Sequence, residues 1–212
     1  MRKEWLALSA AALVTGATAL FFGAHLTPRP TGDGHIFRLA SADPGLWTTS
    51  ALVLFVGALG TLFGISCAVV LVQRRGFRTG VCAMALIAFA SVVLAGFAMQ
   101  LVLLRALSAA GVGADALADA VGDPLQQGLL VGGFGSFYLG ELLLAQALFR
   151  AGTTPTWVPL ALVAHVLGVL VGVASGVDAL GDASALLMVV GLAGVAVSAN
   201  RPDVRHRAGA HT

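Results

Sequence analysis

Two ionisable side chains lie deep inside apolar stretches of this sequence, and they are the residues best able to do chemistry. Glu141 lies within VGGFGSFYLGELLLAQALFR, and His165 lies within WVPLALVAHVLGVLVGVASG. An acidic group at membrane depth marks a functional site by default, because an unpaired charge there is costly. A carboxyl and an imidazole can share a proton and act as general acid and base. We therefore take Glu141 and His165 as candidate catalytic residues.

The spacing of these two residues predicts that they lie at the same depth. Thr153 lies midway between them, in the short connection AGTTPT. If the two segments fold as an antiparallel hairpin, each residue lies about 12 Å from the end of its helix, at roughly 1.5 Å per residue. The spacing gives the depth but not the rotation of either helix, so direct contact between the side chains is a hypothesis.

The pair also has a purely structural interpretation. A buried polar contact between two membrane helices contributes about 0.6 to 2 kcal/mol. An isolated carboxylate at the centre of a span is too costly, so we expect Glu141 to be protonated or paired. A structural clasp and a functional site both remain open at this point.

Aromatic residues share the helical face of Glu141 and predict an apolar pocket. Phe134, Phe137 and Tyr138 precede Glu141 at spacings that place them on its side of the helix. Such rings can line a pocket for an apolar molecule and can stabilise a cation. They are our candidate ligand-binding residues.

Three glycines follow His165 at intervals of four residues, Gly168, Gly172 and Gly176. Such a ridge of small residues lets the backbone of another helix approach closely. We expect all three to pack against a neighbouring helix, which would turn His165 toward a helix interface and away from lipid.

The composition indicates that these segments lie in a membrane. The chain has 212 residues, of which 58% are hydrophobic and only 10% charged, whereas a soluble domain carries about 25% charged residues. The net charge of +2 argues against nucleic acid as a partner. Cys67 and Cys82 lie in apolar runs, and no Cys/His spacing is typical of a metal or haem site, so we expect no metal and no cofactor.

Six apolar runs are long enough to cross the bilayer, which needs about 20 helical residues. We therefore predict an all-α, polytopic helical bundle that forms a single transmembrane domain, a multi-pass protein of the cell membrane with membrane lipids as partners. The start MRKEW also fits a signal peptide, but no clean cleavage site follows, and we expect a retained first span. The predicted spans are 5–25, 47–72, 79–104, 125–149, 157–177 and 183–199.

The basic residues of the predicted loops indicate the orientation. Nine lie on one side: Arg2, Lys3, Arg74, Arg75, Arg78, Arg150, Arg201, Arg205 and Arg207. Three lie on the other: Arg29, Arg38 and Arg105. The positive-inside rule then places both termini in the cytoplasm. The long outer loop that follows the first span carries His35 and Asp33, with His25 and Asp43 beside it, and we interpret these as solvated polar residues because they lack metal-ligand spacing.

The fourth and fifth spans carry a resemblance to a known group of proteins. An aromatic- and Gly-rich helix ends in FRAG, and a Thr/Pro turn leads to WVPLALV. This pattern resembles uncharacterised six-span integral membrane proteins of high-GC bacteria. The resemblance implies no activity.

Three functions remain in competition. The first is a non-enzymatic protein that binds a small apolar or lipid-like molecule or acts as an accessory component. The second is an intramembrane enzyme on a lipid or isoprenoid, for example a proton-initiated terpene cyclase, with Glu141 as general acid and His165 as its partner. The third is a proton-coupled transporter, suggested by a repeat that aligns VGALGTLF with VGGFGSFY, although the sequence predicts no interrupted helix within a span.

Overall fold

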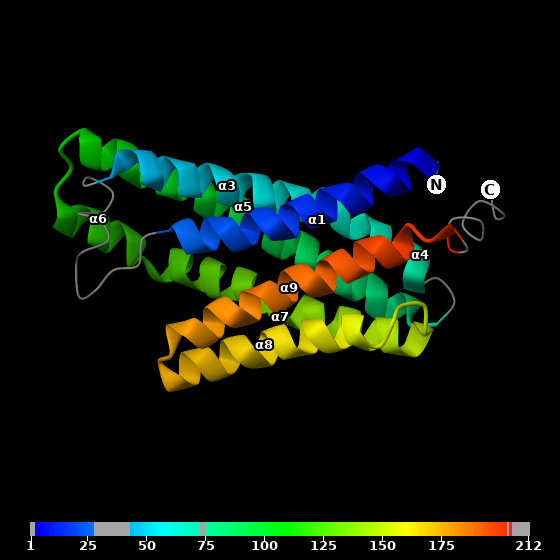
Figure 1. The fold of residues 1–212 in the computed structure, drawn as a ribbon. Coiled ribbons are helices and arrows are strands. Elements are labelled where there is room, and N and C mark those ends of the chain that lie inside the picture. Colours follow the sequence, from blue (N-terminus) through cyan, green and yellow to red (C-terminus); the bar gives the residue numbers. More distant parts are fainter. Residues whose placement is uncertain (1–2, 28–42, 73–74, 203, 205–212) are drawn as a thin grey trace.

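The structure is a computed structural model that describes residues 3–27, 43–72, 75–202 and 204. The described part is helical and contains no strand. Figure 1 shows the helices running along one common direction as an elongated bundle. The helices, with η denoting a 3₁₀ helix, are α1 (Lys3–Leu26), α3 (Pro44–Gly64), η1 (Ile65–Ala68), α4 (Val69–Val72), α5 (Phe77–Ala109), α6 (Ala114–Val121), α7 (Pro124–Ala151), α8 (Trp157–Ser175) and α9 (Asp178–Ala199).

The six predicted spans are confirmed as six helices long and apolar enough to cross a membrane. Two of these helices extend beyond the predicted spans. The third span continues to Ala109, and the sixth begins at Asp178 instead of Ala183. A hydropathy pattern excludes the acidic residues that precede Ala183, whereas the start of a helix accommodates them because its dipole favours negative charge.

Two of the spans begin with the same local sequence, Asp followed by Pro. The carboxylate of Asp43 accepts a hydrogen bond from the backbone N–H of Leu46, and that of Asp123 accepts one from Gln126. In both cases proline occupies the first helical turn, where its missing N–H costs nothing. These caps fix the starts of α3 and α7.

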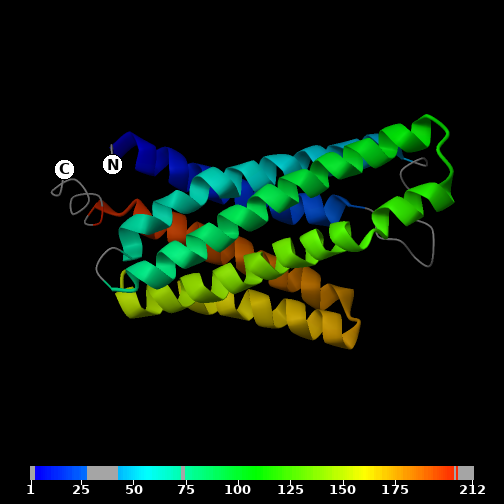
Figure 2. The same cartoon turned by 180° about the vertical axis from the view of Figure 1, so that it is seen from behind.

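The six long helices form a closed ring in sequence order. α1 packs on α3, α3 on α5, α5 on α7, α7 on α8, α8 on α9, and α9 returns to pack on α1. Figures 1 and 2 show the bundle from its two sides, with the start of α1 and the end of α9 at the same end. A ring of six helices encloses a central space, and the content of that space differs between its two ends.

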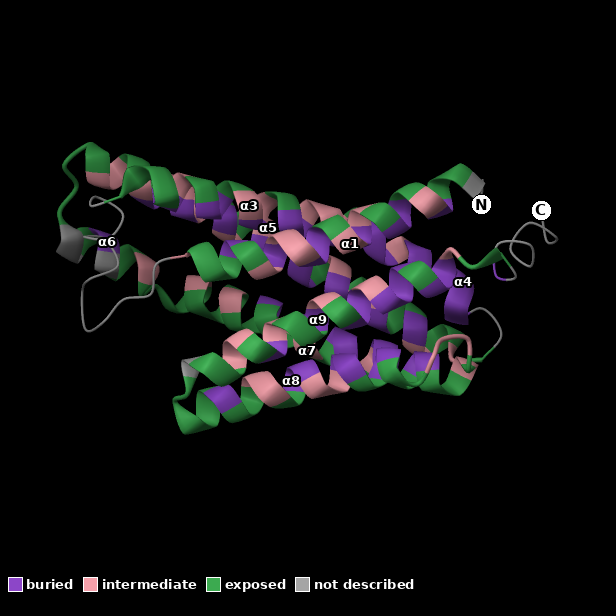
Figure 3. Cartoon of the chain, in the orientation of Figure 1, coloured by how far each residue is buried: buried purple, intermediate pink, exposed green. Residues whose placement is uncertain are grey.

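One end of the ring is filled by the last part of the second span. The expectation of an uninterrupted helix was wrong, because the span changes to a 3₁₀ helix over Ile65–Ala68 before it continues as α4. The change redirects the chain, so that η1 and α4 contact α5, α7 and α9 across the bundle. We call this end, with Ile65–Val72 inside it, the plugged half. Figure 3 shows that buried residues concentrate there.

The interruption follows from close helix packing and from a serine on α1. A Cβ at Gly64 would lie 2.3 Å from the backbone nitrogen of Leu13, so only glycine permits this contact. The hydroxyl of Ser9 lies 2.9 Å from the carbonyl oxygen of Gly64 and 2.8 Å from the hydroxyl of Ser66. The 3₁₀ geometry leaves helical carbonyls without their usual partners, and Ser9 supplies one.

Candidate functional site

The structure places the two predicted ionisable residues in direct contact. Nδ1 of His165 lies 2.6 Å from Oε2 of Glu141, a hydrogen-bond distance between α8 and α7. Both side chains are inside the bundle, with exposed fractions of 0% for Glu141 and 4% for His165. Glu141 and His165 therefore lie at a common depth, as the hairpin predicted. The helices α7 and α8 are also rotated so that the two side chains meet, which the sequence did not determine.

The two residues differ in what else they face. His165 lines a cavity in the centre of the ring, whereas Glu141 does not contribute to its wall. The second carboxyl oxygen of Glu141, Oε1, has no hydrogen-bond partner among the described residues. Glu141 thus lies behind His165 as seen from the cavity, and any group in the cavity meets the imidazole first.

The cavity has a volume of about 660 Å³ and occupies the end of the ring opposite the plugged half. Each of the six long helices contributes to its wall. It opens beside the α8–α9 turn, where the lining residues Val173 and Val177 are 80% and 45% exposed. Along α8, the distance from Gly176 at this opening to His165 is about 16 Å at 1.5 Å per residue. We call this end of the bundle the open half.

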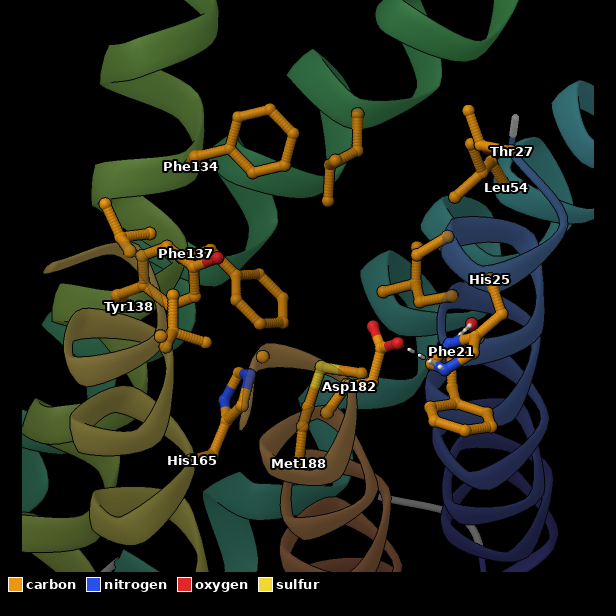
Figure 4. Close-up of a pocket in the computed structure, with 18 of the residues that line it drawn as sticks. Phe21, His25, Thr27, Leu54, Phe134, Phe137, Tyr138, His165, Asp182 and Met188 are labelled. Atoms are coloured by element: carbon orange, nitrogen blue, oxygen red, sulfur yellow. Dashed lines mark hydrogen bonds and ion pairs between the residues drawn. The ribbon is translucent and has the colours of Figure 1, made fainter. Parts of the chain in front are cut away.

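The three predicted aromatic residues all line the cavity. Phe137 is buried, while Tyr138 and Phe134 are partly exposed. The rings form a chain of contacts, with centroids 6.2 Å apart for Phe137 and Tyr138 and 5.8 Å apart for Tyr138 and His165. Figure 4 shows the imidazole of His165 turned toward the space beside Phe137, Tyr138 and Met188. The deep end of the cavity is therefore an imidazole surrounded by aromatic and aliphatic groups.

A second polar pair lies at the opposite end of the cavity. Nε2 of His25, on the last turn of α1, lies 3.6 Å from Oδ2 of Asp182 on α9. The two side chains are 34% and 35% exposed, so water reaches them. Figure 4 shows this pair across the cavity from His165. The cavity is thus apolar along its length and polar at its two ends.

Sequence reasoning missed the pairing of His25 with Asp182. We interpreted His25 as a solvated polar residue beside the first outer loop, and Asp182 falls between the predicted spans 157–177 and 183–199. Both residues lie at span ends on the same side of the bundle, and that shared position is the one signal that could have linked them. His35 and Asp33, the other polar residues of that interpretation, lie outside the described residues.

The glycine ridge after His165 packs against α9 over only part of its length. A Cβ at Gly168 would lie 2.5 Å from Cβ of Ser184, and one at Gly172 would lie 3.1 Å from the nitrogen of Gly181. Gly176 was wrongly assigned to this ridge. It ends α8 in the left-handed conformation, with φ of 67°, and a Cβ there would meet open space. A residue in the left-handed conformation ends an α-helix, and glycine is favoured at that position because it has no Cβ.

The described residues contain no group of three or more His, Cys, Asp or Glu side chains that could hold a metal ion. Comparisons with protein-family models, curated proteins and solved structures give no match. The cavity and its two polar ends are therefore the features that bear on function.

Proposed function

We propose that this integral membrane protein binds a lipid-like apolar molecule in the cavity of its open half. The observation that carries this proposal is a cavity of about 660 Å³ to which all six spans contribute. Binding sites for small molecules typically have volumes of about 300–1,000 Å³ and are mostly apolar with a few placed polar groups. His165 and the His25–Asp182 pair are the polar groups here.

The placement of the cavity supports an apolar ligand over a water-soluble one. Its aromatic wall, Phe134, Phe137 and Tyr138, offers large apolar surfaces and few hydrogen-bonding groups. The exposed side chains beside the opening, Val173 and Val177, are themselves apolar, which favours the entry of an apolar molecule. Favourable contacts with the rings would then hold it, since aromatic side chains contribute much apolar contact area.

Filling the cavity tests this proposal. Val169 lines the cavity, while Val171 on the same helix is 54% exposed and does not line it. We expect Val169→Trp to remove apolar molecules that copurify with the protein, whereas Val171→Trp leaves them in place. Mass spectrometry of extracts from both variants, purified in the same detergent, measures this. Equal retention of the same molecules by both variants would contradict a ligand in this cavity.

A second candidate function, an intramembrane enzyme, is favoured by one specific observation. The imidazole of His165 faces the cavity, and the buried Glu141 orients it from behind. This arrangement reverses the roles expected from the sequence, in which Glu141 was the general acid. Here His165 would exchange a proton with the bound molecule at Nε2, and Glu141 would set the orientation of the ring.

The enzyme candidate makes a different prediction from simple binding. If His165 does chemistry, products derived from the copurifying molecule should accumulate in cells with the native protein and be absent with His165→Phe. Binding alone predicts the same molecules in both cell types. Comparing the apolar extracts of the two strains separates the candidates.

The transporter alternative gains no support from the interrupted second span. Discontinuous helices of transporters place their broken segment at the substrate site. Here Ile65–Ala68 lies in the plugged half, and none of its residues lines the cavity. The interruption fills the bundle and does not contribute to the site.

We also infer that the cavity opens away from the cytoplasm. Nine of the twelve Lys and Arg residues lie on one side of the predicted spans, which the positive-inside rule places in the cytoplasm. The described ones among them, Lys3, Arg75, Arg78, Arg150 and Arg201, lie at the end of the bundle opposite the cavity. A phosphatase active only outside the cytoplasm, fused after Thr212, should therefore be inactive. An active fusion would reverse this orientation and place the opening of the cavity inside the cell.

A further inference from the structure

The hydrogen bond between Glu141 and His165 restricts what the cavity can offer its ligand. Nδ1 of His165 is engaged by the carboxyl group at 2.6 Å, so only the other ring nitrogen, Nε2, is left to meet a molecule in the cavity. A neutral imidazole carries one hydrogen, on either nitrogen, and it is a donor at one and an acceptor at the other. The state of Nδ1 therefore determines the role of Nε2.

Counting protons gives the state of Nε2. If the carboxyl carries its hydrogen on Oε2, it donates to Nδ1, and the ring hydrogen is on Nε2. If the proton has moved to the ring, both nitrogens carry hydrogen, and Nε2 again carries one. Both arrangements leave the pair with zero net charge, and in both Nε2 is a hydrogen-bond donor.

Nε2 becomes an acceptor in two other arrangements. In the first, the acid hydrogen is on Oε1 and Nδ1 donates to Oε2, which leaves a buried O–H donor without a hydrogen-bond partner among the described residues. In the second, a carboxylate lies beside a neutral imidazole that donates from Nδ1. That arrangement has a net negative charge on a group with an exposed fraction of 0%. Its Oε1 would also carry part of the charge without a hydrogen-bond partner among the described residues. An uncompensated buried charge of this kind costs far more than a neutral pair.

The surroundings of Nε2 indicate the kind of acceptor. The ring of Tyr138 lies 5.8 Å from the imidazole, and Phe137 and Met188 line the same end of the cavity. A phosphate or carboxylate would bring a charge to this apolar end beside the carboxyl of Glu141. A carbonyl oxygen on a flat apolar frame accepts one hydrogen bond, carries no charge and places its frame against the aromatic rings.

We propose that the cavity binds apolar molecules that bear a ring carbonyl, with the carbonyl oxygen accepting a hydrogen bond from Nε2 of His165. The proposal rests on the proposed function and specifies its ligand class. Quinones belong to this class. The remaining length of the cavity, toward His25 and Asp182, accommodates the rest of the molecule.

A pair of matched ligands tests the proposal. Menadione is a flat naphthalene ring with two carbonyl groups, and 2-methylnaphthalene has the same ring and methyl group without them. We expect the native protein to bind menadione about tenfold more tightly, because the hydrocarbon leaves the buried donor unsatisfied. Calorimetric titration at a fixed detergent concentration, corrected for the partition of each compound into micelles, measures both affinities.

The matched variants are His165→Phe and Leu167→Phe. The first removes the donor and keeps an aromatic ring, so the two ligands should then bind within about twofold of each other. The second places the same ring at a position that is 54% exposed outside the cavity, so the tenfold preference should persist. A preference that survives His165→Phe would overturn the proposal.

The outcomes also separate this inference from the proposed function. If the native protein binds both ligands equally and Val169→Trp blocks both, the cavity is a binding site but the carbonyl preference is wrong. If neither ligand binds, both proposals fail for flat molecules of this size.

A spectroscopic measurement tests the donor directly and does not depend on folding of the His165→Phe variant. His165 is the histidine that remains when the other four of the five are replaced by Gln. With ¹⁵N-labelled histidine, the Nε2 signal of that protein should show a directly bonded hydrogen at neutral pH. An Nε2 signal without a bonded hydrogen would overturn the proposal.

Discussion

The two halves of the bundle use the same ring of six helices and fill it in opposite ways. In the plugged half, η1 and α4 enter the ring, and Cys67, Leu71 and Val72 are 0%, 1% and 0% exposed. In the open half none of the described segments enters the ring, and a cavity of about 660 Å³ remains. The difference arises at one point in the chain, where the second span leaves α-helical geometry after Gly64.

This contrast shows how a membrane bundle can keep a cavity and still be stable. Helices in lipid gain little from the hydrophobic effect, so close packing and hydrogen bonds must hold them together. The plugged half supplies both, through the contact of Gly64 with Leu13 and the hydrogen bonds of Ser9. The open half contributes less packing and is therefore available for a ligand.

The largest effect should come from the tightest contact of the plugged half. Gly64→Ala would place a Cβ 2.3 Å from the nitrogen and 2.4 Å from Cα of Leu13, and backbone atoms cannot give way easily. We expect a loss of about 2–3 kcal/mol in the free energy of unfolding, as for an overpacked core. Unfolding with sodium dodecyl sulfate measures this loss.

The control for this variant is Gly135→Ala in α7, where a Cβ would meet nothing within 4 Å. Alanine favours the helix over glycine by up to about 1 kcal/mol, so the control should be neutral or stabilising. Equal destabilisation by the two variants would mean that Gly64 does not hold the plugged half together.

The next effect compares one substitution in the two halves. Ala68 is 0% exposed inside the plugged half, whereas Ala185 lines the cavity. Leucine at Ala68 should cost about 1–3 kcal/mol because no space is available. Leucine at Ala185 extends into open volume, and its cost should stay within about 0.5 kcal/mol, as for a substitution without a steric conflict. Thermal unfolding in detergent compares the two, and a similar cost at both sites would mean that the open half is as tightly filled as the plugged half.

The sequence predicted the six spans because hydropathy and length determine them directly. It predicted the common depth of Glu141 and His165 because depth depends on residue counts alone. Their contact needed the rotation of α7 and α8, which is set by packing against α5 and α9. Rotation of this kind is not encoded in any single segment.

The plug could not be predicted because its residues are as apolar as those of an ordinary span. The signal for the interruption is the serine pair, Ser9 and Ser66, on two different helices, and the contact of Gly64 with Leu13. These become informative only once α1 and α3 are known to lie side by side. The sequence did predict an apolar pocket beside Phe134, Phe137 and Tyr138, but the contribution of all six spans to its wall depends on the packing of the whole bundle and was hidden with the plug.

A smaller effect concerns the pair at the deep end of the cavity. If Glu141 and His165 stabilise the bundle through their contact, Glu141→Gln and His165→Phe should be non-additive. We expect a coupling of about 0.5–2 kcal/mol in a double-mutant cycle, in the range of polar contacts between membrane helices. Unfolding free energies of the native protein, the two single variants and the double variant provide the cycle. Simple additivity would mean that the 2.6 Å contact contributes nothing to stability.

The smallest effect should come from the pair at the mouth of the cavity. His25 and Asp182 are about one third exposed and 3.6 Å apart, so water and salt screen their attraction. Exposed ion pairs contribute about 0.2–1 kcal/mol, and we expect a coupling at the low end, below about 0.5 kcal/mol, between His25→Gln and Asp182→Asn. The cycle isolates this pair from other contacts of either residue, and raising the salt concentration should reduce the coupling further. The contrary outcome is a coupling between His25 and Asp182 that is as large as that between Glu141 and His165 and does not change with salt. It would mean that the pair holds the mouth of the cavity closed. The contrast between the plugged half and the open half would then not extend to the opening through which a ligand must enter.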